Sequence, residues 1–119
     1  MRFVILCYDN QEETFAWSKE KDAQVMAQLG AVNDRLAAAG KLGPVVRLDA
    51  TTKAKTLRKG KQAVILDGPF AETKEQLLGF YIVEAETMDE ALLIGKDLAA
   101  ASGSAGAFEI RPLMYYRGN

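Results

Sequence analysis

The stretch "FYIVEAETMDEALLIGKDLAA" (residues 80–100) decides the fold, because it predicts a strand that is followed at once by a helix. Along Phe80–Ala85, apolar side chains alternate onto both faces, which is typical of a strand buried on two sides. Thr87 followed by Glu90 fits a capping box at the start of a helix. The buried face of that helix would consist of three apolar residues at helical spacing, Ala91, Ile94 and Leu98.

A second strand and a second helix are predicted near the N-terminus. Residues 2–8 are apolar on both faces and predict another strand that is buried twice. An acidic loop, "DNQEETFAW", follows, and Ser18 then suits the N-cap of a long helix that reaches Ala39. Gly40 suits the left-handed position after the helix. Four apolar residues form the expected buried stripe: Val25, Leu29, Val32 and Leu36.

The middle of the chain predicts a strand and a hairpin. Residues 42–48 form the expected strand, with Pro44 near its start. The hairpin has arms near 54–58 and 62–66 and turns near Gly60. Its first arm is rich in lysine, which suits an edge strand. Its second arm, "AVILD", is apolar on both faces and is therefore expected at the centre of the sheet. A closing strand is expected over 108–116.

This order predicts an α+β domain over residues 1–119, with a ferredoxin-like βαββαβ antiparallel sheet and an added hairpin. Two helices can cover only one face of such a sheet, whereas three strands are apolar on both faces. A second copy of the chain would cover the other face. The sequence therefore predicts a homodimer with its sheets packed face to face, a dimeric α/β-barrel.

Composition narrows the possible functions. The net charge of −1 argues against nucleic acid, because phosphate binding needs a basic surplus. The first apolar run is too short for a membrane span or a signal sequence, which favours a cytoplasmic protein. The chain has no histidine and one cysteine, Cys7, which excludes a zinc site with the usual ligands and a histidine-activated nucleophile. Any chemistry would use carboxylate, Tyr, Lys or Arg groups, and no cofactor is implied.

The segment "LDGPFAETKEQLLGF" (residues 66–80) is the candidate site. Gly68 and Pro69 fix the direction in which the chain leaves the strand, and Phe70 could anchor the loop or contact a substrate. In one interpretation, Asp67 only caps the turn by accepting backbone N–H groups. In the other, Asp67 ends an apolar strand at the mouth of a pocket, where desolvation would suit it to act as an acid or base.

Other side chains could complete such a site. Tyr8 and Tyr81 could donate hydroxyl groups to a developing oxyanion, although both could equally be core or interface aromatics. Lys74 and Arg111 could hold an anionic substrate, and Glu72 offers a second carboxylate. The charges around residues 72–75 could also be only a solvated loop. Trp17 could be the lid of a pocket or part of a hydrophobic staple.

Several motifs resemble the YCII-related family, in particular its subgroup named for an Asp-Gly-Pro-Phe motif. They are Asp67–Phe70, Glu72–Glu75, "GFY" at 79–81, "MDEAL" at 88–92, "AAG" at 38–40 and "EIRPL" at 109–113. The resemblance spans nearly the whole chain. It implies a dimeric α/β-barrel with ferredoxin-like protomers, which agrees with the two-faced strands.

The resemblance also implies two classes of function. Some members carry a His–Asp pair proposed as a catalytic dyad, and some relatives are small dechlorinating or lactone-processing enzymes. Others are associated with transcription sigma factors. The dyad cannot be carried over to a chain without histidine. Two hypotheses follow: a cofactor-free enzyme that acts on a small anionic or carbonyl compound at Asp67, or a module that binds a small ligand or a regulatory protein. A purely structural dimer is a third.

Overall fold

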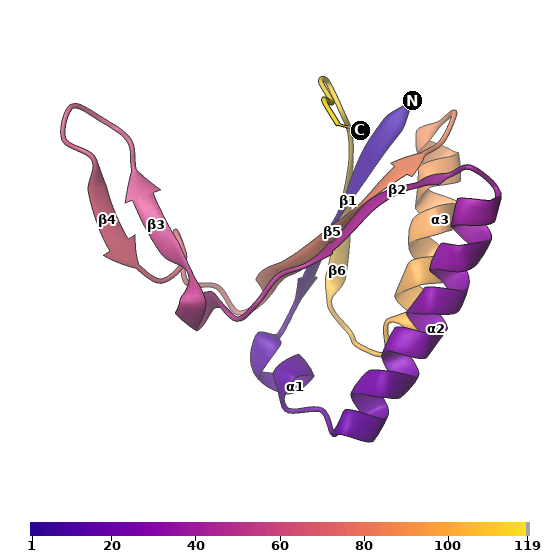
Figure 1. The fold of residues 1–119 in the computed structure, drawn as a ribbon, viewed down its shortest axis with the longest axis horizontal. Coiled ribbons are helices and arrows are strands. Elements are labelled where there is room, and N and C mark those ends of the chain that lie inside the picture. The colour runs from indigo at the N-terminus through magenta and orange to yellow at the C-terminus, as the bar shows by residue number, and fades with distance from the viewer. Residues whose placement is uncertain (119) are drawn as a thin grey trace.

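The computed structural model describes residues 1–118 and contains a four-stranded antiparallel sheet in the order β2-β5-β1-β6 (Figure 1). The strands of this sheet are β1 (Arg2–Asp9), β2 (Leu42–Arg47), β5 (Gln76–Glu84) and β6 (Ala107–Pro112). Two long helices, α2 (Lys19–Ala38) and α3 (Met88–Ala101), cover one face. This is the ferredoxin-like arrangement predicted from the sequence, with a separate hairpin inserted between β2 and β5.

Both long helices begin where their capping residues predict. The Ser18 hydroxyl accepts the backbone N–H of Lys21, and the Thr87 hydroxyl accepts that of Glu90. The reciprocal bond of the second cap differs from a standard capping box, because the Glu90 carboxylate accepts the N–H of Glu86. The segment expected as an acidic loop contains a short helix, α1 (Gln11–Phe15), which is capped by Asn10.

The core lies between the sheet and the two long helices. Phe3 and Ile5 of β1, Val83 of β5 and Leu98 of α3 are almost fully enclosed. The predicted stripes of both helices face this core, except that Leu29 is only partly buried. Burying side chains of this size supplies the main driving force for folding, at about 1.5–3 kcal/mol each.

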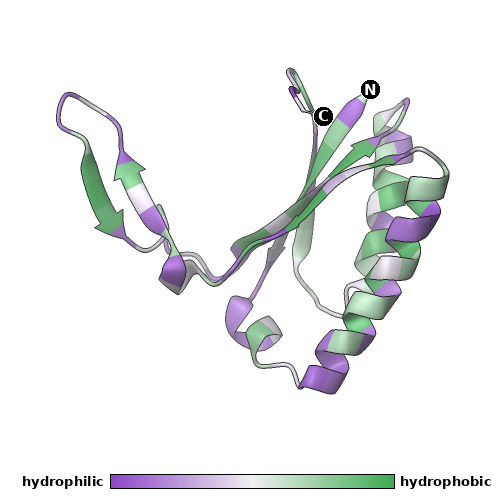
Figure 2. Cartoon of the chain, in the orientation of Figure 1, coloured by the Kyte–Doolittle hydropathy of each residue, from purple (hydrophilic) through white to green (hydrophobic). Residues whose placement is uncertain are grey.

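The hairpin departs from the prediction. Strands β3 (Lys55–Arg58) and β4 (Val64–Asp67) pair only with each other and form a separate two-stranded ribbon, preceded by the short 3-10 helix η1 (Thr51–Lys53). Figure 1 shows the ribbon projecting away from the sheet, and Figure 2 shows β4 as a hydrophobic strand. The expectation that β4 is a central strand was therefore wrong. Its apolar residues are exposed, with Ile65 at 68%.

The second face of the main sheet has no helix over it. On this face Val4 and Leu6 are half-buried, opposite Arg111 and Glu109 of β6. The two faces of β1 are therefore buried to different extents within one chain. The closing strand also ends earlier than expected, at Pro112. None of the helices within residues 1–118 has both the length and the apolar character needed to cross a membrane.

Candidate functional site

A pocket of about 220 Å³ lies between α2 and the sheet, next to α1, and we call it the helix-side pocket. Most of its wall surface is apolar, although polar and charged side chains stand among the lining residues. Such a composition is typical of pockets for small molecules. It is lined by Cys7, Tyr8, Asp9, Thr14, Phe15, Trp17, Asp22, Val25, Met26, Leu29, Gly30, Asn33, Val45, Val46, Arg47, Leu48, Leu78, Gly79, Tyr81, Ser102, Ser104 and Phe108.

Asn33 is the unusual polar residue of the α2 wall. Its side-chain oxygen is buried and has no hydrogen-bond partner among the described residues. Leaving a buried acceptor unpaired costs about 1–3 kcal/mol. Asn33 contributes to the α2 wall, but this oxygen is enclosed by the protein and does not face the pocket.

Tyr81 and Cys7 bring two weakly acidic groups to the sheet wall. Burial raises the pKa of the Tyr81 hydroxyl from 10.0 to about 12, and the Cys7 side chain adds to this rise. Burial also raises the pKa of the Cys7 thiol from 9.0 to about 12, with the Asp9 carboxylate as a smaller cause. At neutral pH both groups therefore stay protonated. Tyr81 can donate a hydrogen bond, and Cys7 is a poor nucleophile.

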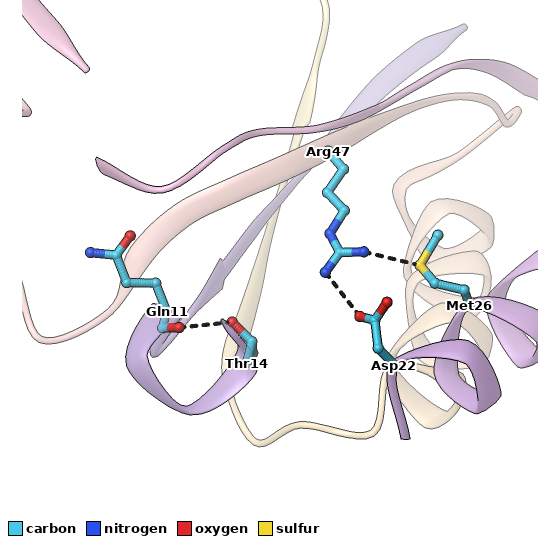
Figure 3. A network of polar contacts seen from close by, with 5 residues as sticks. All are labelled: Gln11, Thr14, Asp22, Met26 and Arg47. Carbon is cyan, nitrogen blue, oxygen red and sulfur yellow. Dashed lines mark hydrogen bonds and ion pairs between the residues drawn. The ribbon is translucent and has the colours of Figure 1, made fainter. Parts of the chain in front are cut away.

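Arg47 bridges β2 and α2 at the edge of this pocket, as Figure 3 shows. Its guanidinium group donates to the Asp22 carboxylate at 3.1 Å and to the Met26 sulfur at 3.5 Å. All three side chains are at least partly accessible to solvent. An anionic group on a ligand could compete with Asp22 for Arg47, since both would be acceptors for the same donors.

Gln11 fixes α1 beside the pocket. The Thr14 hydroxyl donates to the Gln11 carbonyl at 3.3 Å (Figure 3). The Gln11 side-chain amide donates to the Thr51 hydroxyl at 2.6 Å and accepts the Thr51 backbone N–H at 3.0 Å. The Gln11 backbone N–H donates to the Gln76 side chain at 3.0 Å. These bonds hold Phe15 and Trp17 at one end of the pocket.

Trp17 lines the pocket, which agrees with one of its two sequence interpretations. A hydrophobic staple would need an apolar partner at the fourth residue of α2, but that position is Asp22. Instead, the Lys21 ammonium lies 4.7 Å from the centre of the Trp17 ring.

The segment 66–80 lies elsewhere. The Asp67 side chain is 89% exposed, and its carboxylate accepts the Lys55 ammonium at 2.6 Å. It lines neither the helix-side pocket nor the groove beside the hairpin described below. The following turn relies on Gly68, whose φ of 93° favours glycine, and on its N–H bond to Ala54. The suggested cap of the turn by Asp67 is replaced by this ion pair.

An apolar groove of about 620 Å³ runs beside the base of the hairpin and contains Tyr8 and Phe70. Of the two roles suggested for Phe70, that of an anchor beneath its loop is wrong, because its side chain is 73% exposed. The Arg58 guanidinium lies 5.1 Å from its ring centre. Tyr8 lines both this groove and the helix-side pocket, where it shares the lining with Tyr81, whereas Phe70 lines only the groove.

The remaining predicted residues are exposed and scattered. Glu72 and Lys74 lie in the loop before β5, and neither lines the helix-side pocket or the groove. Arg111 lies on the second face of the sheet, where its Nε is 4.0 Å from Glu109. The structure therefore does not gather these residues around Asp67 within one chain. No three His, Cys, Asp or Glu side chains within residues 1–118 form a group that could hold a metal ion.

Sequence reasoning missed most residues of the helix-side pocket, among them Gly30, Asn33 and Arg47. Gly30 and Asn33 are both poor helix formers in the interior of a long helix, which was the available signal. No sequence signal marked Arg47, because an arginine at the end of a strand is common.

Two comparisons place the chain among known proteins. The family described as YCII-related domain matches residues 1–117. The chain is also 51% identical over 118 residues to an uncharacterised protein of Rhizobium meliloti (strain 1021), a match that covers 98% of this chain and 95% of the relative.

Proposed function

The chain belongs to the YCII-related family, and from that premise and the pocket geometry we propose that it binds a small, largely apolar molecule in the helix-side pocket. The observation that carries this proposal is the largely apolar wall that α2 and the sheet present to a pocket of about 220 Å³. Apolar pockets with a small number of polar groups are typical sites for small molecules. The apolar walls would supply most of the affinity.

The protonation states of the pocket favour binding over catalysis by these groups. The pKa values of about 12 for Tyr81 and Cys7 leave neither a base nor a thiolate at neutral pH. Asp67, the proposed acid or base of a cofactor-free enzyme, does not line this pocket. Asp67 would need a second chain to become part of an enclosed site.

The ligand-binding proposal is tested by titrating ¹⁵N-labelled protein with a set of small single-ring compounds. Binding in the pocket should shift the amide signals of Leu29 to Asn33 and of Gly79 and Tyr81, because these residues form its two walls. Signals of the exposed strand β4 serve as the internal control. Shifts confined to β4, or none at all, would contradict the proposal.

We further propose that the protein forms a homodimer through the second face of the sheet and the hairpin. Four exposed side chains support this, because in a lone chain they would leave apolar surface on both faces of the hairpin in water. They are Leu57, Val64, Ile65 and Leu66. A second copy of the chain offers the same surface. In a two-fold dimer the apolar surfaces of the two chains would cover each other. A regulatory protein on this surface is the alternative.

The dimer proposal is tested by light scattering after size-exclusion chromatography of two matched variants. Ile65→Lys should yield monomers, because it places a charge on the hairpin. Leu93→Lys places the same charge on an equally exposed apolar residue of α3 and should leave the dimer intact. A monomeric wild-type chain would contradict the dimer and would favour a different partner for the hairpin.

A further inference from the structure

The two strands of the hairpin differ in how their outer edges are protected. Strand β3 carries Lys55 and Arg58, and cations on an edge strand discourage pairing with another strand. Strand β4 is uncharged from Val64 to Leu66, and its only charge is Asp67 at its end. In Figure 1, β4 lies on the side of the ribbon that is turned away from the main sheet. Its outer edge is therefore open and lacks the cations that protect β3.

A hydrogen bond at the base of the ribbon shows which backbone groups face that edge. The Gly68 N–H donates to the Ala54 carbonyl at 2.8 Å, so these two residues form a hydrogen-bonded pair. Such pairs alternate along an antiparallel ladder, so the even-numbered residues of β4 also bond to β3. The N–H and C=O groups of Ile65 and Asp67 consequently point outward, where no strand within residues 1–118 pairs with them.

A ribbon of this size needs a further strand to be stable. Strands β3 and β4 have four residues each and pair only with each other. An isolated two-stranded hairpin is marginally stable at best in water, whereas three or more strands with an apolar face can be stable. A strand that pairs with the open edge of β4 would meet this need.

The edge of β4 is complementary to a second β4 strand. A two-fold axis perpendicular to the ribbon brings the same strand of two copies together in antiparallel direction. With Ile65 of one copy opposite Ile65 of the other, these two residues exchange N–H and C=O bonds, and Asp67 lies opposite Ala63. Leu57 pairs with Ile65 within each chain, so the four side chains form one apolar row across four strands.

The charges of the hairpin favour the same arrangement. Lys59 and Lys61 lie at its tip, whereas Asp67 lies near its base. An antiparallel pair places the tip of each hairpin beside the base of the other, so Lys61 of one copy lies diagonally across from Asp67 of the other. A shift of the register that centres the pair on Leu66 would bring the two Asp67 carboxylates into diagonal positions, which is unfavourable for like charges.

We propose that β4 of one chain pairs with β4 of a second copy, so that the two hairpins form one continuous four-stranded antiparallel sheet. This inference rests on the proposed homodimer, because it specifies the strands through which the hairpins join. The contact is closed, since each open edge is used by the other copy. It also explains why β4 is apolar although it lies outside the main sheet.

Two single-cysteine variants of the full-length chain locate the contact. Both carry Cys7→Ala, which removes the only native thiol. Ile65→Cys should form a disulfide between copies under mild oxidation, because opposed residues of paired strands lie about 5.5 Å apart and a disulfide joins Cα atoms about 4.4–6.8 Å apart. Leu57→Cys is the matched control, since Leu57 is exposed on the same face of the ribbon. Its two copies would be three strand spacings apart, about 14 Å, so it should cross-link at least about tenfold more slowly.

Hydrogen exchange of the wild-type protein tests the same contact without any substitution. The amides of Ile65 and Asp67 face solvent in a lone chain and bond to the other copy in the proposed sheet. Their exchange should slow by at least about tenfold at concentrations at which the dimer forms, and the protection should disappear on dilution. The amide of Ile5, in a strand that is paired on both sides within one chain, is the internal reference and should stay protected.

The outcomes distinguish this inference from the homodimer on which it rests. Cross-linking through position 57 that is as fast as through position 65, in a chain that is dimeric by light scattering, overturns the inference and indicates that the hairpins meet face to face. Unprotected amides at Ile65 and Asp67 in such a dimer overturn it as well. A wild-type chain that stays monomeric contradicts both the inference and the homodimer.

Discussion

Helices α2 and α3 cover the same face of one sheet, but they meet it in different ways. On α3, Leu98 is completely enclosed and Gly95 sits against Ile110. On α2, Leu29 is only partly buried, Gly30 faces open space, and Asn33 keeps a buried oxygen unpaired. The contrast shows that α2 gives up more of its packing, at the helix-side pocket, although α3 also borders a cavity of about 220 Å³ beside Gly95 and Ile110.

The largest effect on the free energy of unfolding is expected when a leucine in each helix is replaced by alanine. Leu98→Ala should lower the free energy of unfolding by about 3 kcal/mol, because it leaves a cavity in the closed core. Leu29→Ala should lower it by about 1 kcal/mol, since that side chain already borders open space. Urea denaturation measures both. Equal losses would mean that the pocket closes in solution.

The pH dependence of stability probes the sheet wall that α2 leaves open. The folded pKa of Tyr81, about 12, lies above its ordinary value of 10.0. The folded state therefore binds the proton more tightly, so stability is complete below about pH 10 and falls as the pH rises towards 12. The wild-type protein should lose about 2–3 kcal/mol of its free energy of unfolding over this range. Tyr81→Phe, which has no hydroxyl group to titrate, should not show this loss. Denaturation from pH 8 to 12 checks this, and parallel curves for the two proteins would contradict it.

Replacing the unpaired group on α2 should increase stability. Asn33→Leu removes a buried acceptor without a partner and adds apolar volume, so the free energy of unfolding should rise by about 1 kcal/mol. Thermal unfolding without ligand measures the gain. Asn33→Asp is the matched control and should be destabilising, because it places a charge in the same surroundings. A destabilised leucine variant would show that Asn33 has a partner in solution.

The two glycines provide a finer comparison. Gly30→Ala should raise the free energy of unfolding by about 0.5–1 kcal/mol, because alanine favours the helix and its Cβ meets nothing. Gly95→Ala should gain less, since the end of the Ile110 side chain must shift to make room for the new methyl group. Urea denaturation measures the gain in the free energy of unfolding for both variants. A larger gain for Gly95→Ala would contradict the tighter packing inferred for α3.

The smallest effect is expected away from both helices. Asp67→Asn breaks the exposed ion pair with Lys55 and should change the free energy of unfolding by less than about 0.5 kcal/mol. Its effect on ligand binding to the helix-side pocket should be nil. Weaker ligand binding by this variant would contradict this prediction and would support the role in a binding site that the sequence suggested for Asp67.

The sequence predicted the sheet and the long helices because their signals are local. Caps at Ser18 and Thr87 and stripes at helical spacing fix where helices begin and which face they bury. The position of β4 could not be predicted in the same way. Its apolar side chains indicate that the strand is covered. The sequence pattern is the same whether the main sheet of its own chain or another molecule covers it.

The candidate site was harder to predict, for a related reason. Tyr81 was identified from its place on a central strand, whereas Asp67 was chosen because it ends an apolar strand that was expected to be buried on both faces. That strand is exposed, so the expected desolvation is absent. Asn33 and Gly30 have no motif. They stand out only when the structure shows that one lacks a partner and the other lacks a neighbour.

The base of the hairpin has a consequence for how such a protein can change over time. The Leu48 N–H donates to the Leu78 carbonyl at 2.8 Å, and Arg47 pairs with Gly79, so the two ends of the insertion lie side by side. The insertion between Leu48 and Leu78 can therefore vary in length while β2 and β5 stay paired. It is nevertheless tied to the helix-side pocket, because Thr51 and Gln76 bond Gln11 of α1. A relative that lost the insertion would also lose the bonds that fix α1 beside the pocket.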